Sequence, residues 1–332
     1  MTSYLSKKIA FFHAFGVLLV LPIHTIFPCT DSFGTVRHLL VLLCRSFQPI
    51  YFGLAGYLFF IGVLGGGNCK DKILKRIKTL LVPYLIWNVW VAILMIALYY
   101  WGIDAPIVSN FEEHLGSYSL LSVLKYIFWT PVAGHLWFIR DLMLVSILSL
   151  PLYYVLRNNK WYTLIILCLI ALLTYQVQFA SLFSFAVGGY LSINKVDIQK
   201  IKNGIVIVAG ILLMALFVIF ACMKRECNAI PVMSWGTAIL LWVLYDKIIP
   251  NDSSFDITPW RSYFFFIYLF HNPFLNIICA YASKMLPNTF LSNSLVFILS
   301  QLTIVFISLQ LGKFMNVHTP RLYAIITGNR KR

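Results

Sequence analysis

The chain has 332 residues, of which 60% are hydrophobic and only 11% are charged, and its formal net charge is +15. A soluble domain of this length carries far more charge, so the composition excludes a soluble protein and predicts an integral membrane protein. The basic residues lie in short segments between apolar runs and form no nucleic-acid motif. We therefore expect no nucleic-acid partner and interpret these residues as signals of membrane orientation.

Ten apolar runs are long enough to cross about 30 Å of hydrocarbon as helices. They predict an all-α, polytopic membrane protein with about ten transmembrane helices and membrane lipids as its surroundings. The fifth and sixth runs are short and almost continuous, so eight or nine spans remain an alternative. The runs lie near 9–26, 38–64, 79–101, 135–156, 161–177, 179–193, 203–222, 229–249, 261–283 and 291–312.

Most of the 26 Lys and Arg residues lie in alternate connections between these runs, beginning with the N-terminal segment and including 65–78 and the C-terminal segment. The positive-inside rule assigns such segments to the cytoplasm. We therefore predict that the N- and C-termini are both cytoplasmic. No helix-pair repeat or low-complexity linker is evident, so we expect a single domain over residues 1–332 with no appended soluble domain.

The first apolar run contains two histidines, His13 and His24, directly behind the basic pair Lys7 and Lys8. Lipid tails offer an imidazole no partner, so a ring in a spanning helix normally faces protein or a water-filled cavity and is a functional candidate. His24 is therefore the first candidate for a catalytic base. The alternative is a histidine that caps a loop at the membrane surface or hydrogen-bonds a neighbouring helix.

Four further polar residues lie at a similar predicted depth, in the outward half of their spans: Arg45, His135, Arg140 and Asp141. Ions in apolar helices are costly, so each needs a partner or water. A histidine with a nearby carboxylate can take a proton from a hydroxyl, because the carboxylate holds the ring tautomer. Convergence with His24 on one cavity is one interpretation. A structural ion pair of Asp141 with Arg140 or Arg45 is the other.

The ninth run, at 261–283, carries His271 near its middle, two residues before Pro273. The proline frees a backbone carbonyl one turn earlier in the helix. One interpretation is an imidazole that repairs this broken helix by hydrogen-bonding the freed carbonyl. The alternative is a role at the reaction centre.

The segment at 70–78 enters the third span and carries five cations and one anion. Ordinary positive-inside bias is one explanation for this charge. The spare charge is also what a phosphate-rich cytosolic ligand needs at the mouth of a pore. The cations are Lys70, Lys72, Lys75, Arg76 and Lys78.

The seven cysteines show no metal-ligand spacing such as C-x-x-C. Most of them lie inside or at the ends of apolar runs, where a thiol serves as a small packing residue. We therefore expect no metal site.

Five segments in order resemble membrane acyltransferase family 3, the multi-span O-acyltransferases that modify bacterial surface polysaccharides and related sugars. Each segment is weak alone, but the five together are fairly specific and cover nearly the whole chain. The segments are VLPIH at 20–24, RSFQPIYFGLAGYL at 45–58, KRIKTLLVPY at 75–84, HLWFIRDL at 135–142 and YLFH at 268–271.

The resemblance implies a helical membrane enzyme of about ten spans in the cytoplasmic (inner) membrane of a bacterium. It implies transfer of an acyl group, commonly acetyl, from cytoplasmic acyl-CoA to a hydroxyl of a cell-surface polysaccharide or its lipid-linked sugar precursor. Acetyl-CoA or another acyl-CoA is then the donor substrate, and the glycan is the acceptor.

Carried onto this sequence, the resemblance makes His24 the essential histidine and the segment at 70–78 the contact for the CoA phosphates. Relatives usually have an arginine where this chain has His13, which can meet a phosphate or thioester when protonated. Ala55-Gly56-Tyr57 replaces their usual Ser-Gly-Tyr or Ser-Gly-Phe. The expected catalytic residues are His24, Asp141 and His135, the donor-binding residues are His13, Lys72, Lys75, Arg76 and Lys78, and the substrate-binding residues are Arg45, Trp137, Arg140 and His271.

Two other functions fit parts of the pattern. In a transporter or flippase for a lipid-linked glycan, the same buried ions would line a passage. The inverted repeat and the Gly/Pro-broken span pairs typical of that class are missing from the sequence. A structural partner in a polysaccharide assembly complex is the third option, if His13 in place of arginine abolishes donor binding.

Overall fold

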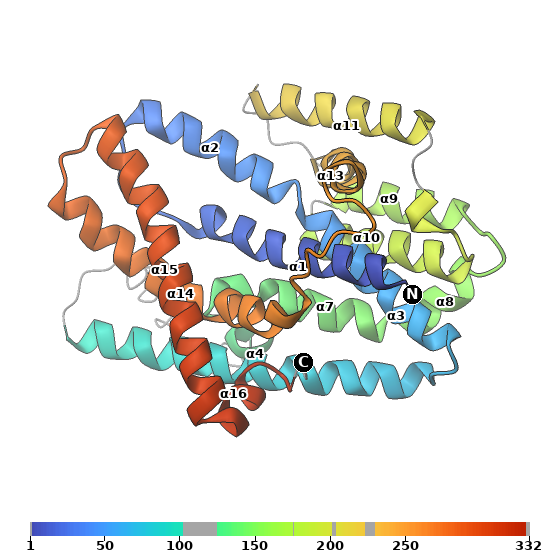
Figure 1. Ribbon diagram of the computed structural model, residues 1–332, viewed down its shortest axis with the longest axis horizontal. Coiled ribbons are helices and arrows are strands. Elements are labelled where there is room, and N and C mark those ends of the chain that lie inside the picture. Colours follow the sequence, from blue (N-terminus) through green and yellow to red (C-terminus); the bar gives the residue numbers. More distant parts are fainter. Residues whose placement is uncertain (1, 102–124, 175, 201–203, 223–229, 330–332) are drawn as a thin grey trace. The chain divides into compact units, whose positions relative to one another are not determined.

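The computed structural model describes residues 2–101, 125–174, 176–200, 204–222 and 230–329, and this part of the chain is all-helical (Figure 1). The larger part of the predicted connection at 102–134 lies outside the described residues. The helices are α1 (Ser3–His24), α2 (Asp31–Arg45), α3 (Gln48–Leu64), α4 (Cys69–Tyr100), α7 (Trp137–Ile147), α8 (Ser149–Leu156), α9 (Tyr162–Thr174), α10 (Val177–Ile193), α11 (Gly204–Cys222), α12 (Ile230–Met233), α13 (Trp235–Ile248), α14 (Arg261–Met285), α15 (Phe290–His318) and α16 (Pro320–Ile326).

Five helical segments of the described chain are long and apolar enough to cross a membrane, and a bent pair makes a sixth if it forms one span. The chain is therefore a multi-pass membrane protein. Three shorter apolar helices coincide with α9, α10 and most of α11. The total of ten spans and the cytoplasmic termini stay predictions. The candidate spans are Ser3–His24, Asp31–Leu64, Cys69–Leu98, Thr258–Met285 and Phe290–His318, and the bent pair is Gly134–Ile147 with Ser149–Leu156.

The second span differs from the sequence expectation of one helix over 38–64. It begins earlier, at Asp31, and is interrupted between α2 and α3. The interruption has a local cause, since Pro49 lies in the first turn of α3, where its missing N–H is not needed. Arg45 consequently ends α2, and a cation at a helix C-terminus interacts favourably with the helix dipole.

Contacts divide the chain into two compact units. The first unit comprises Met1–Leu19, Val41–Ile77 and Asp141–Pro259. The second comprises Val20–Leu40, Lys78–Arg140 and Trp260–Arg332. The expectation of one domain over residues 1–332 stays a prediction.

The first unit is built on an unusually close contact between α3 and α10. A Cβ at Gly188 would lie 1.8 Å from the carbonyl oxygen of Gly53, and one at Gly56 would lie 2.1 Å from that of Phe185. Backbone atoms therefore touch where side chains normally separate helices. Small residues permit this approach in membrane helices, where van der Waals packing is a main source of association.

We expect Gly188→Ala to destabilise the protein by about 1–3 kcal/mol, because the added methyl group must force α3 and α10 apart. The measurement is the thermal unfolding midpoint in detergent. Gly204→Ala is the matched control, since a Cβ at Gly204 meets no atom within 4 Å. Equal midpoints for the two variants would contradict the close contact.

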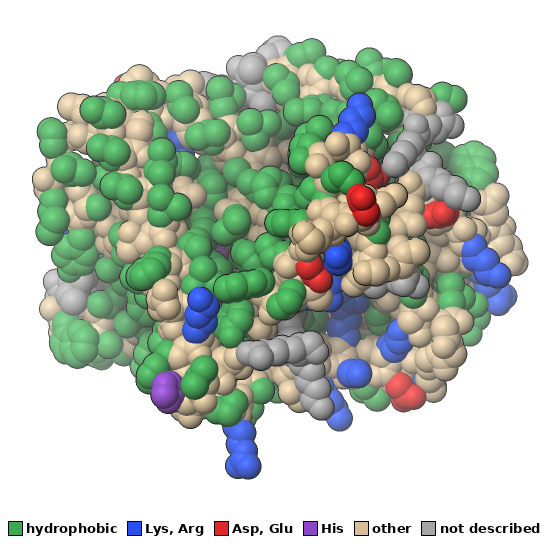
Figure 2. Space-filling view, viewed as in Figure 1, with side chains coloured by type: hydrophobic (Ala, Val, Ile, Leu, Met, Phe, Trp, Pro, Cys, Tyr) green, Lys and Arg blue, Asp and Glu red, His purple; other side chains and the backbone are tan. Residues whose placement is uncertain are grey.

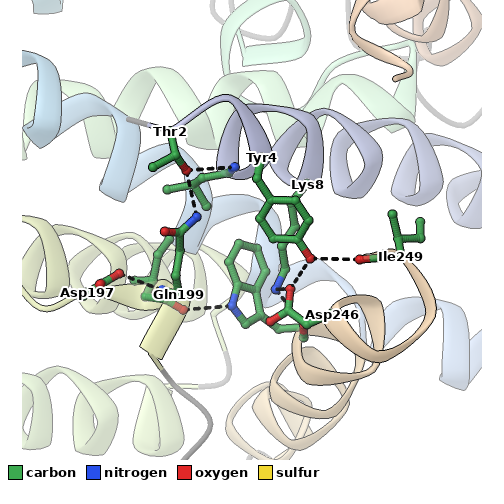
Figure 3. A network of polar contacts seen from close by, with 10 residues as sticks. Thr2, Tyr4, Lys8, Asp197, Gln199, Asp246 and Ile249 are labelled. Atoms are coloured by element: carbon green, nitrogen blue, oxygen red, sulfur yellow. Dashed lines mark hydrogen bonds and ion pairs between the residues drawn. The ribbon is translucent and has the colours of Figure 1, made fainter. Parts of the chain in front are cut away.

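A polar network ties the start of α1 to the end of α13 in the first unit (Figure 3). The Lys8 amine is only 1% exposed and lies 2.8 Å from a carboxylate oxygen of Asp246 and 2.7 Å from the carbonyl oxygen of Trp242. The Tyr4 hydroxyl donates to the same carboxylate at 2.6 Å. The amine also lies over the Trp242 ring, 3.8 Å from its centroid. A buried ion pair with several partners holds the two helix ends together.

The second unit centres on α14 and α15, which pack against each other, and α16 contacts α15 (Figure 1). Aromatic rings of Phe266 and Tyr323 meet at a centroid distance of 5.7 Å. The indole N–H of Trp87 in α4 donates to the carbonyl oxygen of Ile326 at 3.1 Å. These contacts fix α4 and α16 against the half of α14 that precedes its break.

Hydrophobic side chains cover much of the face shown in Figure 2, above all its left part. Large apolar residues on two helices are more than half exposed, including Leu212 at 60% in α11 and Phe306 at 63% in α15. Soluble monomers rarely expose contiguous apolar surface of this kind. Such a surface is typical of helices that face lipid.

Candidate active site

Three histidines from distant parts of the chain meet inside the second unit. His24 is the last residue of α1, His135 lies in the short 3-10 helix Gly134–Leu136, and His271 lies in α14. The ring centroids are 4.8 Å apart for His135 and His271, 5.3 Å for His24 and His271, and 6.3 Å for His24 and His135. His135 and His271 are 1% and 0% exposed, and His24 is partly buried. Three basic side chains therefore share one small region.

The end of α1 is anchored to α14. The Thr25 hydroxyl donates to the carbonyl oxygen of Leu21 at 2.8 Å and closes the last turn of the helix. The backbone N–H of Ile26 donates to the side-chain oxygen of Asn276 at 3.4 Å. His24 lies within the turn that Thr25 closes and two residues before Ile26, so its backbone is held next to α14.

Backbone carbonyls of α14 hold the other two rings. Nε2 of His135 lies 3.2 Å from the carbonyl oxygen of Leu269, and Nδ1 of His271 lies 2.7 Å from that of Tyr268. The Tyr268 hydroxyl donates to the carbonyl oxygen of His135. The carbonyl one turn before Pro273 is that of Leu269, and His135 contacts it, whereas the sequence interpretation gave this contact to His271. His271 instead contacts the carbonyl of Tyr268 in its own helix. That contact leaves the second nitrogen of the His271 ring for a role in the reaction.

Tyr268 is a neighbour of the histidine cluster that sequence reasoning missed. Its ring centroid lies 5.5 Å from that of His135. A signal was present, because Tyr268 precedes His271 by three residues and residues three apart share one face of a helix.

Two further predicted residues belong to the same unit. Trp137 begins α7 directly after the 3-10 helix of His135 and is partly buried. Arg140, one turn later, is 9% exposed, donates to the carbonyl oxygen of Trp129 and lies over its indole ring, 5.5 Å from the centroid. A guanidinium held on an aromatic face is fixed in position. The substrate-binding roles of Trp137 and Arg140 stay predictions.

Asp141, Arg45 and His13 belong to the first unit. Asp141 is 1% exposed and accepts a hydrogen bond from the Ser181 hydroxyl at 3.2 Å. Arg45 is exposed at the end of α2. The His13 ring lies parallel to that of Tyr51, with centroids 6.4 Å apart and planes 3° from parallel. The catalytic role of Asp141, the substrate-binding role of Arg45 and the donor-binding role of His13 stay predictions.

The predicted donor-binding cations differ in orientation. In the first unit, Arg76 donates to the carbonyl oxygen of Ala55 at 3.3 Å, and its guanidinium lies 5.7 Å from the centroid of Phe59. Lys72, one helical turn earlier, runs along α3, where a Cβ at Gly62 would lie 1.4 Å from its Nζ. Lys75 and Lys78 are exposed, and Lys78 belongs to the second unit. Lys72 and Arg76 thus share an inward face of α4, which charge counting alone did not reveal.

Among the described residues, no group of three or more His, Cys, Asp or Glu side chains is arranged to hold a metal ion. The three imidazoles of the histidine cluster can form hydrogen bonds and can accept or donate a proton.

A family model described as an acyltransferase domain matches residues 9–311. The chain is also similar to the succinoglycan biosynthesis protein ExoH of Rhizobium meliloti strain 1021, with 26% identity over 200 residues. That match covers 58% of this chain and 54% of the relative, so the chain spans about half the length of this curated relative. No solved structure matches the chain significantly.

Proposed function

The chain belongs to acyltransferase family 3, and from that premise we propose that it moves an acyl group, acetyl in the simplest case, from cytoplasmic acyl-CoA to a hydroxyl of a cell-surface polysaccharide or its lipid-linked precursor. Family membership makes the protein an acyltransferase. The polysaccharide acceptor is supported by the similarity to a succinoglycan biosynthesis protein. A transporter or flippase role has no comparable support.

The observation that carries the proposal is the convergence of His24, His135 and His271 at the end of α1, within the region that the family model matches. Acyl transfer to a hydroxyl needs a base that accepts a proton near neutral pH, and imidazole is the side chain suited to that task. His24 is the least buried of the three rings, so it is the one best placed to meet a substrate.

The proposed reaction is direct attack. The acceptor hydroxyl oxygen forms a bond to the thioester carbonyl carbon while His24 takes the hydroxyl proton. The carbon–sulfur bond then breaks, and the CoA thiolate leaves with the electron pair and receives the proton from His24. Asp141 and His135 are proposed as further catalytic residues, and Arg45, Trp137, Arg140 and His271 as substrate-binding residues.

The CoA phosphates are proposed to meet the basic face of α4, together with His13. We expect Lys72→Gln with Arg76→Gln to raise the Kd for acyl-CoA at least about tenfold, because each lost charge-assisted hydrogen bond is worth about 1.5–3 kcal/mol. Binding to the unaltered protein should weaken with added salt, since ions screen the phosphate contact. Isothermal titration calorimetry at two salt concentrations measures both the Kd for acyl-CoA and its dependence on salt.

The proposed donor contact is narrower than the sequence expectation and omits the exposed Lys75, so Lys75→Gln, which removes a cation from the same helix, is the matched control for that pair. Its Kd for acyl-CoA should change far less than that of the double variant. Folding of every variant is verified first by its melting temperature. An unchanged Kd in a folded Lys72/Arg76 variant would remove this face from donor binding and leave its charge as a topology signal.

The function itself is tested with purified protein, acetyl-CoA labelled in its acetyl group, and polysaccharide from the host cell stripped of ester groups by mild alkali. The expected product is labelled polysaccharide whose label mild alkali releases, because a hydroxyl ester is alkali-labile. Release of free labelled acetate without labelled polysaccharide would contradict the proposed acceptor. Absence of both products, with bound acetyl-CoA, would contradict the proposed reaction.

A further inference from the structure

The carbonyl of Leu269 in α14 has lost its usual helical donor. The helix is interrupted at Asn272, whose backbone angles (φ −108°, ψ 126°) are not helical, and Pro273 follows. A proline has no N–H, so Pro273 cannot donate to the carbonyl of Leu269, four residues earlier. Within a membrane span such a carbonyl needs another donor. Nε2 of His135, 3.2 Å from the Leu269 oxygen, occupies the donor position.

These carbonyls determine which nitrogen of each ring carries a hydrogen. A carbonyl oxygen only accepts hydrogen bonds, so the nitrogen that contacts it must be the N–H. His135 is therefore protonated at Nε2. His271 is protonated at Nδ1, which lies 2.7 Å from the carbonyl oxygen of Tyr268. In the neutral rings, His135 Nδ1 and His271 Nε2 then carry lone pairs and can only accept.

Those two acceptor nitrogens are buried and have no hydrogen-bond partner among the described residues. Their rings are neighbours of each other and of His24. Buried polar atoms in folded proteins are almost always paired, so two orphaned acceptors in one cluster indicate a missing donor. An ionised carboxylate or phosphate offers only acceptors and cannot fill this role, whereas a hydroxyl group can.

We infer that Pro273 is a positioning residue, which turns His135 toward Leu269 and thereby leaves His135 Nδ1, together with His271 Nε2, to accept hydrogen bonds from hydroxyl groups of the acceptor beside His24. The assignment of the sugar acceptor as the ligand rests on the proposed function. The assignment of the ring tautomers does not rest on it. A sugar ring carries several hydroxyls close together, so one reacts at His24 while its neighbours are held by the other two rings. The site thus selects an uncharged polyol at this position.

The tautomers are tested by solid-state NMR on the full-length protein in lipid, with ¹⁵N only in its seven histidines. The expected spectrum shows His135 protonated at Nε2 and His271 protonated at Nδ1, each assigned by the signal lost in its glutamine variant. In Pro273→Ala, the new N–H at residue 273 competes for the Leu269 carbonyl, so the His135 signal should no longer show a single tautomer. The opposite tautomer in the unaltered protein would overturn the inference.

Two kinetic readouts accompany the spectra. Because Pro273 acts through His135, Pro273→Ala should raise the KM for the polysaccharide by no more than the loss of the ring itself does, with little change in KM for acetyl-CoA. His135→Leu removes the Nδ1 acceptor, whereas glutamine would keep an amide oxygen that also accepts hydrogen bonds. The KM of His135→Leu for the polysaccharide should rise about 2- to 10-fold, the effect of one neutral hydrogen bond. His38→Leu, at an exposed histidine, is the matched control.

The outcomes separate this inference from the proposed function. The predicted tautomers with a raised KM in His135→Leu support the inference, and this second variant decides it even if Pro273→Ala does not fold. A folded His135→Leu protein with unchanged KM for the polysaccharide overturns it. Lack of any transfer by the unaltered protein, with the predicted tautomers present, counts against the proposed function alone.

Discussion

His24→Ala should lower acyl transfer about 10²- to 10⁴-fold while the protein stays folded in the membrane. General-base assistance contributes that factor in enzymes, which corresponds to about 3–5 kcal/mol of activation free energy. The imidazole is partly buried at the end of α1, and the backbone around it is anchored by Thr25 and Asn276. Removal of the ring therefore leaves the helix end in place. Initial rates of label transfer to the polysaccharide measure the effect.

The chain supplies a matched control, because His38 in α2 is an exposed histidine of the same unit. His38→Ala should transfer at the rate of the unaltered protein. A merely structural imidazole at position 24 would instead reveal itself as a lower melting temperature at unchanged specific activity. A His24→Ala protein with normal melting behaviour and near-normal rate would exclude His24 as the base, and His135 and His271 would be tested next.

Lys8→Met should destabilise the protein by about 3–5 kcal/mol, the usual effect of removing one partner from a buried ion pair. The amine is almost inaccessible to solvent and contacts the Asp246 carboxylate, a backbone carbonyl and an indole ring (Figure 3). The substitution leaves the carboxylate buried with the Tyr4 hydroxyl but without a cation. Unfolding in detergent, followed by circular dichroism against denaturant or temperature, measures the loss.

The double variant Lys8→Met with Asp246→Leu provides the control for that experiment. Replacing both members of a buried pair by apolar residues is often neutral, because no uncompensated charge remains. We therefore expect the double variant to recover most of the stability that Lys8→Met loses. The single variant Asp246→Leu completes the comparison. If the double variant lost as much stability as Lys8→Met and Asp246→Leu lose together, the two side chains would not interact, contrary to the 2.8 Å contact.

Composition and hydropathy were enough to predict the helical membrane class, because apolar runs long enough to cross the hydrocarbon layer are visible in the sequence itself. They did not locate the break between α2 and α3. The polar residues at the break are few, and the apolar runs on either side of it are long, so a hydropathy average stays high across the interruption. The signal was local instead: Pro49 favours a helix start at that point.

The histidines were singled out because an imidazole is unusual in an apolar helix. Their mutual distances could not be predicted, because they depend on how helices far apart in the sequence are rotated and packed. His271 in particular was expected near mid-span, apart from the outward group, yet its ring is the one closest to His135.

The partner of Lys8 could not be predicted from the sequence either. Its charge was interpreted as a topology signal of the N-terminal segment, whereas the structure pairs it with Asp246, which lies 238 residues away in sequence. Opposite charges at ends of two spans on the same predicted side were the available signal. Nothing in sequence spacing specified that these two helix ends would meet.

Transfer across a sealed bilayer is the most direct test of the proposed function. Protein is reconstituted in vesicles, and its orientation is established with an impermeant reagent on a single cysteine placed at Lys75. Labelled acetyl-CoA is supplied on the Lys75 side and deacylated polysaccharide on the other. We predict alkali-labile label on the polysaccharide with the unaltered protein and only trace label with His24→Ala. Label equal in both proteins, or label only when both substrates share one compartment, would contradict acyl transfer across the membrane by His24.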